Sequence, residues 1–370
     1  MKYYIIAGEA SGDLHASNLM KELKVQDPSA QFRCWGGDLM QAAGGELVKH
    51  YRSLAFMGFT EVLLNLSTIL GNLSFCRKDI SEFKPDALIL VDYPGFNLRI
   101  AKFAHQAGFK VFYYISPQVW AWKQSRVHSI KKYVHRMFVI LPFEKEFYAR
   151  FGIDVDFVGH PLHDAIAGDI TKTQSDEFRN KHRIGEQPVI ALLPGSRKQE
   201  IERVLPVMLE VVPDFRDYQF VVAGVSSVGL GFYDKIIKGS DVRILFDETR
   251  ELLRNSQTAL VTSGTATLET AMIGIPQVVC YKGGQLSYLI ARQLIKVPFI
   301  SLVNLIAGRQ VIEELIQQKL NRKTLSKSLA RILPGHPDRT RILADYQELN
   351  KLLGSEKASQ KTASLIISYL

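Results

Sequence analysis

Cysteine is scarce in this chain: only Cys34, Cys76 and Cys280 occur among 370 residues. Their odd number and wide spacing exclude a disulfide framework and a paired-cysteine zinc site. We therefore expect three small buried apolar side chains in a protein of a reducing compartment.

Long apolar runs are also lacking. No stretch has the ~18 uninterrupted apolar residues of a membrane span. The first thirteen residues, MKYYIIAGEASGD, hold too short an apolar run for a signal peptide and pass directly into a glycine-bearing turn. Solenoid repeats and low-complexity tracts are missing as well. These absences favour a globular cytosolic protein.

The charges that are present favour anionic partners. The chain has 46 basic and 37 acidic residues, a net charge of +9. Such a balance suits nucleotide phosphates, phosphorylated lipids, an acidic membrane face or nucleic acid, without choosing among them. The length predicts two α/β domains.

The first domain opens with an apolar strand over 3–6 and a turn that carries Gly8 and Gly12. These glycines are four residues apart, so the dinucleotide fingerprint of a dehydrogenase is absent. Glu9 and Asp13 would repel a pyrophosphate, which makes sugar hydroxyls the better ligand. A buried strand over 87–91 ends at Asp92. Carboxyl ends of parallel strands face the ligand crevice, so Asp92 lies where an acid would act, unless it only caps the next helix or serves the turn.

Another predicted strand, 110–115, ends in an aromatic loop. Gln118, Trp120 and Trp122 there can stack on and hydrogen-bond a sugar, or can anchor the loop by packing. The basic run that follows includes Arg126. It is either a solvated helix face or a surface for a phosphorylated acceptor or anionic headgroups.

Residues 53–75 contain one charge, Glu61, in an otherwise apolar and polar-uncharged segment. A predicted loop carries Phe56, Met57 and Phe59, and a helical stripe follows it. The stripe is either plain core or a surface for acyl chains at a membrane. Its apolar members are Val62, Leu66, Ile69 and Leu73, flanked by Leu63 and Leu70, and the predicted polar face holds Glu61, Asn65, Thr68 and Asn72.

The second half repeats the strand–helix pattern from residue 189. The first turn holds Gly195, Ser196 as a predicted helix cap, and Arg197, which can grip a phosphate. A later strand over 258–261 ends in a turn before a helix of small residues. Two such turns in one sheet predict a nucleotide diphosphate between helix N-termini. The second turn holds Ser263, Gly264 and Thr265, with Glu269 one helical turn further on.

We predict a first domain over 1–165, a linker over 166–187, a second domain over 188–335, and terminal helices over 336–370 that return to the first domain of the same chain or of a partner chain. Residues 38–48 and 310–320 are expected to be helical. Asp154 and Asp156 resemble a metal-binding Asp-x-Asp motif, but they enter a strand at its amino end. We therefore predict no metal site.

Seven blocks, in order along nearly the whole chain, resemble lipid-A-disaccharide synthases, which are inverting glycosyltransferases of the two-domain GT-B type. The blocks are Gly8-Glu-Ala-Ser-Gly-Asp13, Val91-Asp-Tyr-Pro-Gly-Phe-Asn97, Ser116-Pro-Gln-Val-Trp-Ala-Trp122, Leu141-Pro-Phe-Glu-Lys145, Leu193-Pro-Gly-Ser-Arg197, Ser263-Gly-Thr-Ala-Thr-Leu-Glu269 and Asn304-Leu-Ile-Ala-Gly-Arg309.

The resemblance implies two Rossmann-like domains with parallel sheets facing across a cleft. It also implies transfer of 2,3-diacylglucosamine from its UDP donor to 2,3-diacylglucosamine 1-phosphate at the cytoplasmic face of the inner membrane, without a metal or other cofactor. The partners would be these two substrates and the anionic membrane surface, with no nucleic acid and a possible homodimer. Asp92 would be the catalytic acid, with Glu9 and Asp13 as alternatives.

For the donor, the resemblance implies that Glu269 binds the ribose and that Arg197, Asn304 and Arg309 make further contacts. Gln310 stands where the family often has glutamate, so it can hydrogen-bond but cannot act as a base. Rival interpretations are a UDP-N-acetylglucosamine 2-epimerase, a peptidoglycan-precursor transferase, or a non-catalytic nucleotide-binding protein of the membrane surface.

Overall fold

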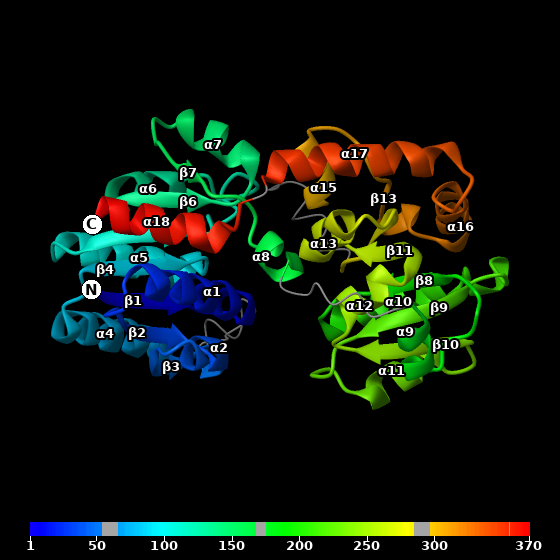
Figure 1. Ribbon diagram of the computed structural model, residues 1–370, viewed down its shortest axis with the longest axis horizontal. Helices are drawn as coiled ribbons and strands as arrows, with labels where there is room; N and C mark the ends of the chain where they lie inside the picture. Colours follow the sequence, from blue (N-terminus) through cyan, green and yellow to red (C-terminus); the bar gives the residue numbers. More distant parts are fainter. Residues whose placement is uncertain (54–65, 168–174, 285–296, 355) are drawn as a thin grey trace. The chain divides into compact units, whose positions relative to one another are not determined.

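The computed structural model describes residues 1–53, 66–167, 175–284, 297–354 and 356–370. The chain forms two compact units (Figure 1). Unit 1 contains 1–167 and 353–370, and unit 2 contains 168–352.

Unit 1 is built on a seven-stranded parallel sheet of order β3-β2-β1-β4-β5-β6-β7. Its central strand β4 is wholly apolar and wholly buried, as expected where helices cover both faces of a sheet. The strands are β1 Lys2–Ala7, β2 Gln31–Gly36, β3 Glu46–His50, β4 Ala87–Val91, β5 Lys110–Tyr114, β6 Arg136–Val139 and β7 Asp156–Phe157.

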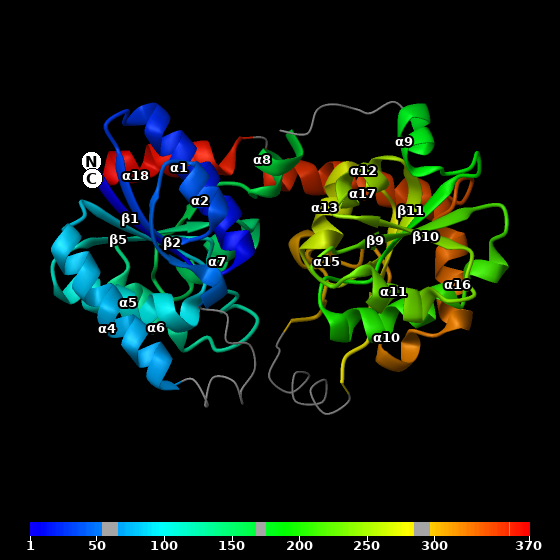
Figure 2. The same ribbon diagram turned by 90° about the horizontal axis from the view of Figure 1, so that it is seen from below.

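Two layers of helices cover this sheet (Figure 2). One face packs against α4, α5, α6 and α7, and the other against α1, α2 and α18. The helices are α1 Ala10–Gln26, α2 Asp38–Ala42, α4 Leu66–Phe83, α5 Pro94–Gln106, α6 Arg126–Tyr133, α7 Pro142–Ala149, α8 Leu162–Ala167 and α18 Ala358–Tyr369, with a short 3-10 turn at Tyr51–Ser53.

Unit 2 has a six-stranded parallel sheet of order β10-β9-β8-β11-β12-β13. The strands are β8 Val189–Leu193, β9 Gln219–Gly224, β10 Val242–Phe246, β11 Ser256–Thr262, β12 Gln277–Tyr281 and β13 Glu314–Ile316. The helices are α9 Ser175–His182, α10 Lys198–Leu209, α11 Leu230–Ile237, α12 Thr249–Arg254, α13 Thr265–Ile273, α15 Leu302–Ala307, α16 Arg322–Arg331 and α17 Pro337–Leu353, with 3-10 turns at Val212–Asp214 and Gln317–Lys319.

The C-terminal segment divides between the two units. Helix α18 packs along α1 in unit 1, as predicted. Helix α17 belongs to unit 2 except for its last residue, Leu353. The prediction that all of 336–370 returns to the first domain is therefore wrong for α17, whose Ile342, Tyr346 and Leu349 are buried there.

Two predicted helices contain strands instead. Residues 38–48 form the short helix α2 and then β3, and 310–320 form β13 and a 3-10 turn. Each strand lies at the edge of its sheet, where one neighbour suffices: β3 pairs only with β2, and β13 only with β12. Pairing with these neighbours outweighs the weak helical pattern of both segments.

Candidate active site

A cavity of about 370 Å³ lies at the carboxyl ends of the adjacent strands β8 and β11 in unit 2. We call it the β8–β11 cavity. It brings together both glycine-bearing turns that the sequence singled out. The residues that line it are Leu193, Gly195, Ser196, Arg197, Glu200, Ala223, Val225, Thr249, Thr262, Ser263, Gly264, Thr265, Ala266 and Glu269.

The turn after β8 is shaped by Gly195. Its φ of +103° is unfavourable for other residues, and a Cβ there would lie 2.6 Å from the Glu200 carboxylate. Arg197 is the N-cap residue of α10, so the predicted cap role of Ser196 is wrong, and Ser196 is exposed at the cavity. The Arg197 side chain is 68% exposed, and its Nη1 donates to Glu200 Oε1 over 3.2 Å. One weakly paired guanidinium therefore stands at the cavity.

The turn after β11 leads into α13, which begins at Thr265 with Gly264 as its N-cap. The first amides of a helix lack acceptors within the helix and carry its positive dipole end, so they favour an anion. Ser263 is already engaged, because its hydroxyl donates to the Ile300 carbonyl over 2.9 Å. Glu269 lies one turn along and accepts from Arg250 Nε over 2.7 Å.

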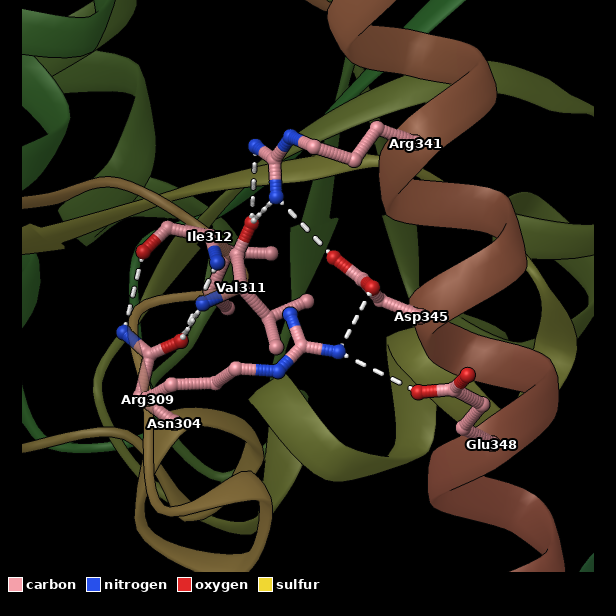
Figure 3. Close-up of polar contacts among 7 residues, drawn as sticks. All are labelled: Asn304, Arg309, Val311, Ile312, Arg341, Asp345 and Glu348. Carbon is pink, nitrogen blue, oxygen red and sulfur yellow. Dashed lines mark hydrogen bonds and ion pairs between the residues drawn. The ribbon is translucent and has the colours of Figure 1, made fainter.

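The predicted donor contacts at 304–310 do not line the β8–β11 cavity in the described part of the chain. Asn304 is fully buried and fixes the 311–312 backbone: its Nδ2 donates to the Ile312 carbonyl, and its Oδ1 accepts from the amides of Val311 and Ile312 (Figure 3). A fully engaged buried amide has no group left for a ligand. The geometry thus replaces the predicted donor contact of Asn304 with a structural role.

Arg309 also bonds within unit 2 (Figure 3). Its Nη2 donates to Asp345 over 2.8 Å and to Glu348 over 3.2 Å, both on α17. Asp345 in turn accepts from Arg341 over 2.9 Å. Gln310 is exposed and lines a separate cavity of about 210 Å³ beside α16 and α17. In this structure Arg309 ties the 308–312 loop to α17 rather than facing the β8–β11 cavity.

In unit 1, Asp92 follows β4 in a left-handed conformation with φ of 42°. Its carbonyl accepts from Asn97 Nδ2 over 2.7 Å and from the Tyr113 hydroxyl over 2.5 Å, which holds the residue in this conformation. Helix α5 is capped by Tyr93 and not by the Asp92 carboxylate, so the cap role weighed for Asp92 does not apply. Burial, together with the nearby charge of Glu9, raises the pKa of Asp92 to about 6.

The other two predicted acids differ sharply. Glu9 is exposed at the start of α1, close enough to act on Asp92. Asp13 is 3% exposed and accepts from the amides of Gly37, Leu39 and Met40 at 2.8 to 3.1 Å. Its carboxylate caps α2 and is saturated with donors, so Asp13 is wrong as an alternative base.

Comparison with known proteins identifies the family. A family model described as lipid-A-disaccharide synthetase matches residues 3–367. Lipid-A-disaccharide synthases from Syntrophus aciditrophicus and Nitrosococcus oceani are each 40% identical, over 99% of this chain and 97% and 95% of their own lengths. The chain belongs to the lipid-A-disaccharide synthase family. It is a glycosyltransferase of lipid A biosynthesis.

Solved structures of low sequence identity agree on the GT-B-like fold. A UDP-GlcNAc 2-epimerase from Neisseria meningitidis, bound to UDP-GlcNAc, has a TM-score of 0.69 at 12% identity with full coverage of both chains. The glycosyltransferase of kitacinnamycin has a TM-score of 0.68 at 12% identity, covering 100% of this chain and 99% of its own. These likenesses concern the fold alone. The sequence relatives, not the fold, favour the disaccharide synthase over the epimerase.

In this lipid-A-disaccharide synthase family member, the predicted aromatic acceptor loop divides into buried and exposed parts. Trp120 is 7% exposed and packs edge-on against Phe143, whereas Trp122 is 43% exposed and Gln118 is exposed. Arg126 is half-buried at the start of α6. The packing role weighed for the tryptophans therefore applies to Trp120, and Trp122 is open to a ligand.

Phe56, Met57 and Phe59 lie outside the described residues. In the part of the segment that is described, Leu70 and Phe75 of α4 are 55% and 48% exposed. Asn72 was predicted on the polar face, but it is 6% exposed and accepts from Lys49 over 2.6 Å. Helix α4 therefore exposes Leu70 and Phe75 and buries the Asn72 amide. The helical pattern could not predict this burial, because the hydrogen-bond partner Lys49 lies in β3.

Sequence reasoning missed several residues that hold the site. Tyr113 and Asn97 fix the Asp92 backbone, and Arg250 holds Glu269. Asn97 lies within a family-like block, which was a usable signal. Glu144 is 1% exposed, accepts from the amides of Ile140 and Leu141, and has its pKa raised to about 7 by burial.

The described residues hold no cluster of three or more His, Cys, Asp or Glu side chains suited to a metal ion. Asp154 pairs with Arg136, and Asp156 accepts from the Tyr369 hydroxyl over 3.1 Å. Within the same described residues, the helices are all too short or too polar to span a bilayer.

Proposed function

We propose that the enzyme transfers 2,3-diacylglucosamine from UDP-2,3-diacylglucosamine to 2,3-diacylglucosamine 1-phosphate. The products are the β-1,6-linked disaccharide 1-phosphate and UDP. The observation that carries this proposal is the β8–β11 cavity, where two strand–helix turns and Arg197 can hold a diphosphate and the Glu269 carboxylate can accept from a ribose.

The donor's diphosphate would lie against the helix amides at Gly264 and Thr265 and the Arg197 guanidinium. These fixed positive groups would stabilise the charge that grows on UDP as the bond from its phosphate oxygen to sugar C1 breaks. We propose that they act without a metal ion or other cofactor. Glu269, oriented by Arg250, would accept hydrogen bonds from the ribose hydroxyls.

Asp92 would be the general base. The acceptor's O6 attacks C1 of the donor sugar from the face opposite UDP, and its proton passes to the Asp92 carboxylate. With a pKa of about 6, this carboxylate is mostly ionised at neutral pH yet more basic than an exposed aspartate. The Asn97 amide and the Tyr113 hydroxyl both donate to the Asp92 carbonyl, so the backbone that carries the carboxylate is fixed in advance.

We further propose that unit 1 rests on the anionic cytoplasmic face of the inner membrane, where both lipid substrates would be found. Exposed Leu70 and Phe75 would contact the acyl region. The net charge of +9 favours such a surface.

The test is a reconstituted transfer. Purified enzyme is incubated with UDP-2,3-diacylglucosamine and labelled 2,3-diacylglucosamine 1-phosphate in detergent micelles. Disaccharide and UDP should appear in equal amounts, which mass spectrometry and a UDP assay would measure. Clean UDP binding without any disaccharide would overturn the proposed reaction, and addition of EDTA should leave the rate unchanged if no metal takes part.

A further inference from the structure

Two cations in unit 1 lie on one exposed indole ring. The Lys123 Nζ is 4.6 Å and the Arg126 Cζ is 5.5 Å from the centre of a Trp122 ring, within the range of a cation–π contact. Within the described residues neither cation forms an ion pair. The two positive charges repel each other in the free protein. An anion placed between them would be attracted by both and would relieve that repulsion.

The backbone holds this group in an unusual conformation. The loop that carries Trp122 begins at Ile115, with φ of 64°, and ends at Lys123, with φ of 53°. Both are left-handed, which is costly for side chains with a Cβ and especially for a β-branched isoleucine. The surrounding fold therefore imposes the loop geometry, and it does so where Trp122 and its two cations are presented.

The group lies near Asp92. The Tyr113 hydroxyl bonds the Asp92 carbonyl, and the charge of Arg126 acts on the same phenol, where it partly offsets the rise in pKa that burial causes. A glucosamine acceptor that directs one hydroxyl at Asp92 carries its 1-phosphate on the same sugar ring. Arg126 is half-buried, so its contact with a phosphate would be screened less by water than one at the open surface.

We propose that Arg126 and Lys123, held on the face of Trp122, bind the 1-phosphate of the acceptor and so select a phosphorylated sugar lipid. This inference rests on the proposed function. The planar guanidinium of Arg126 matches a phosphate with two parallel donors, and the lysine adds a mobile charge. The indole keeps the guanidinium in place before the acceptor arrives.

The experiment compares two acceptors, 2,3-diacylglucosamine with and without its 1-phosphate, in detergent micelles. Arg126→Gln and Lys123→Gln should each lower kcat/KM for the phosphorylated acceptor by ~10–100-fold, the usual effect of losing a charged hydrogen bond. Neither should change kcat/KM for the dephosphorylated acceptor by more than about 2-fold, because that acceptor lacks the phosphate that the two cations bind. Lys132→Gln, an exposed lysine on the same helix α6, is the control and should leave both acceptors unaffected.

Other outcomes separate the possibilities. Equal losses with both acceptors would overturn the phosphate assignment and give the group a structural role; UDP affinity and thermal unfolding report on folding. Unchanged kinetics in micelles together with weaker binding to phosphatidylglycerol vesicles would overturn it in favour of membrane headgroups. If the wild-type enzyme transfers to neither acceptor, the proposed function itself fails.

Discussion

Replacing Asp92 with asparagine should separate catalysis from donor binding. Asparagine has nearly the same shape, and the bonds from Asn97 and Tyr113 to the residue 92 carbonyl do not involve the side chain. The loop should therefore keep its conformation. General-base catalysis contributes ~100–10,000-fold, so turnover should fall by at least ~100-fold while UDP affinity stays within about 2-fold. A loss of turnover smaller than ~10-fold would refute the assignment.

The same substitution should stabilise the folded protein at neutral pH. Burial raises the pKa of Asp92 from 3.8 to about 6, so folding favours the protonated form. The stability that this preference provides is complete below pH 3.8 and is lost as pH rises through 6. At about 1.4 kcal/mol per pKa unit, the ionised carboxylate costs about 3 kcal/mol above pH 7. Asparagine avoids that cost.

The assay is thermal unfolding of wild type and variant at pH 7.5 and pH 4. The variant's Tm should be several degrees higher at pH 7.5, and the difference should shrink toward pH 4. In wild type, the pH profile of kcat/KM should have an acidic limb: the value should fall as pH drops through about 6 and the base becomes protonated. Glu9→Gln should move that limb to lower pH, because the charge of Glu9 raises the pKa of Asp92. If Glu9→Gln leaves the acidic limb unmoved, and Asp92→Asn has the same Tm as wild type at pH 7.5, the surroundings described for Asp92 are wrong.

The remaining predictions concern donor and membrane binding. Arg197→Ala should weaken binding of both UDP and inorganic pyrophosphate by ~10–100-fold in calorimetry, whereas Arg203→Ala on the same helix should change neither. Glu269→Gln should lower the affinity for UDP by ~10-fold but not the affinity for pyrophosphate, since its proposed partner is the ribose. An equal loss of affinity for both ligands would contradict that role. Leu70→Glu should weaken sedimentation with anionic vesicles at unchanged Tm, and Ser81→Glu on the same helix should not weaken it.

The sequence predicts those parts of the fold that are buried and repeated. A continuous apolar run, as in β4 and β8, indicates a strand whose sheet is covered by helices on both faces. Each of these runs is also followed by a turn and a helix. The edge strands β3 and β13 were missed for the opposite reason. Each is short, partly exposed and carries charge, for example Lys49 in β3 and Glu314 in β13. Such a composition also suits a helix, so the choice between helix and strand depends on pairing with the neighbouring strand.

Asp13 and Asp92 show why site residues are harder to predict than strands. Asp92 directly follows β4, and Asp13 lies in the first turn of α1 after β1. The sequence favours Asp92 for this reason, but it gives no ground for rejecting Asp13. Their difference comes from distant partners: amides 24 to 27 residues away saturate Asp13. The buried surroundings of Asp92 instead leave its carboxylate costly to ionise, with Glu9 adding like charge. The oxygens of Asp13 already accept three amide hydrogen bonds, which leaves little room for a substrate hydroxyl, whereas a desolvated carboxylate such as Asp92 gains by accepting a proton. Among these acids, therefore, the number of donors contributed by the rest of the fold decides which one can act on a substrate.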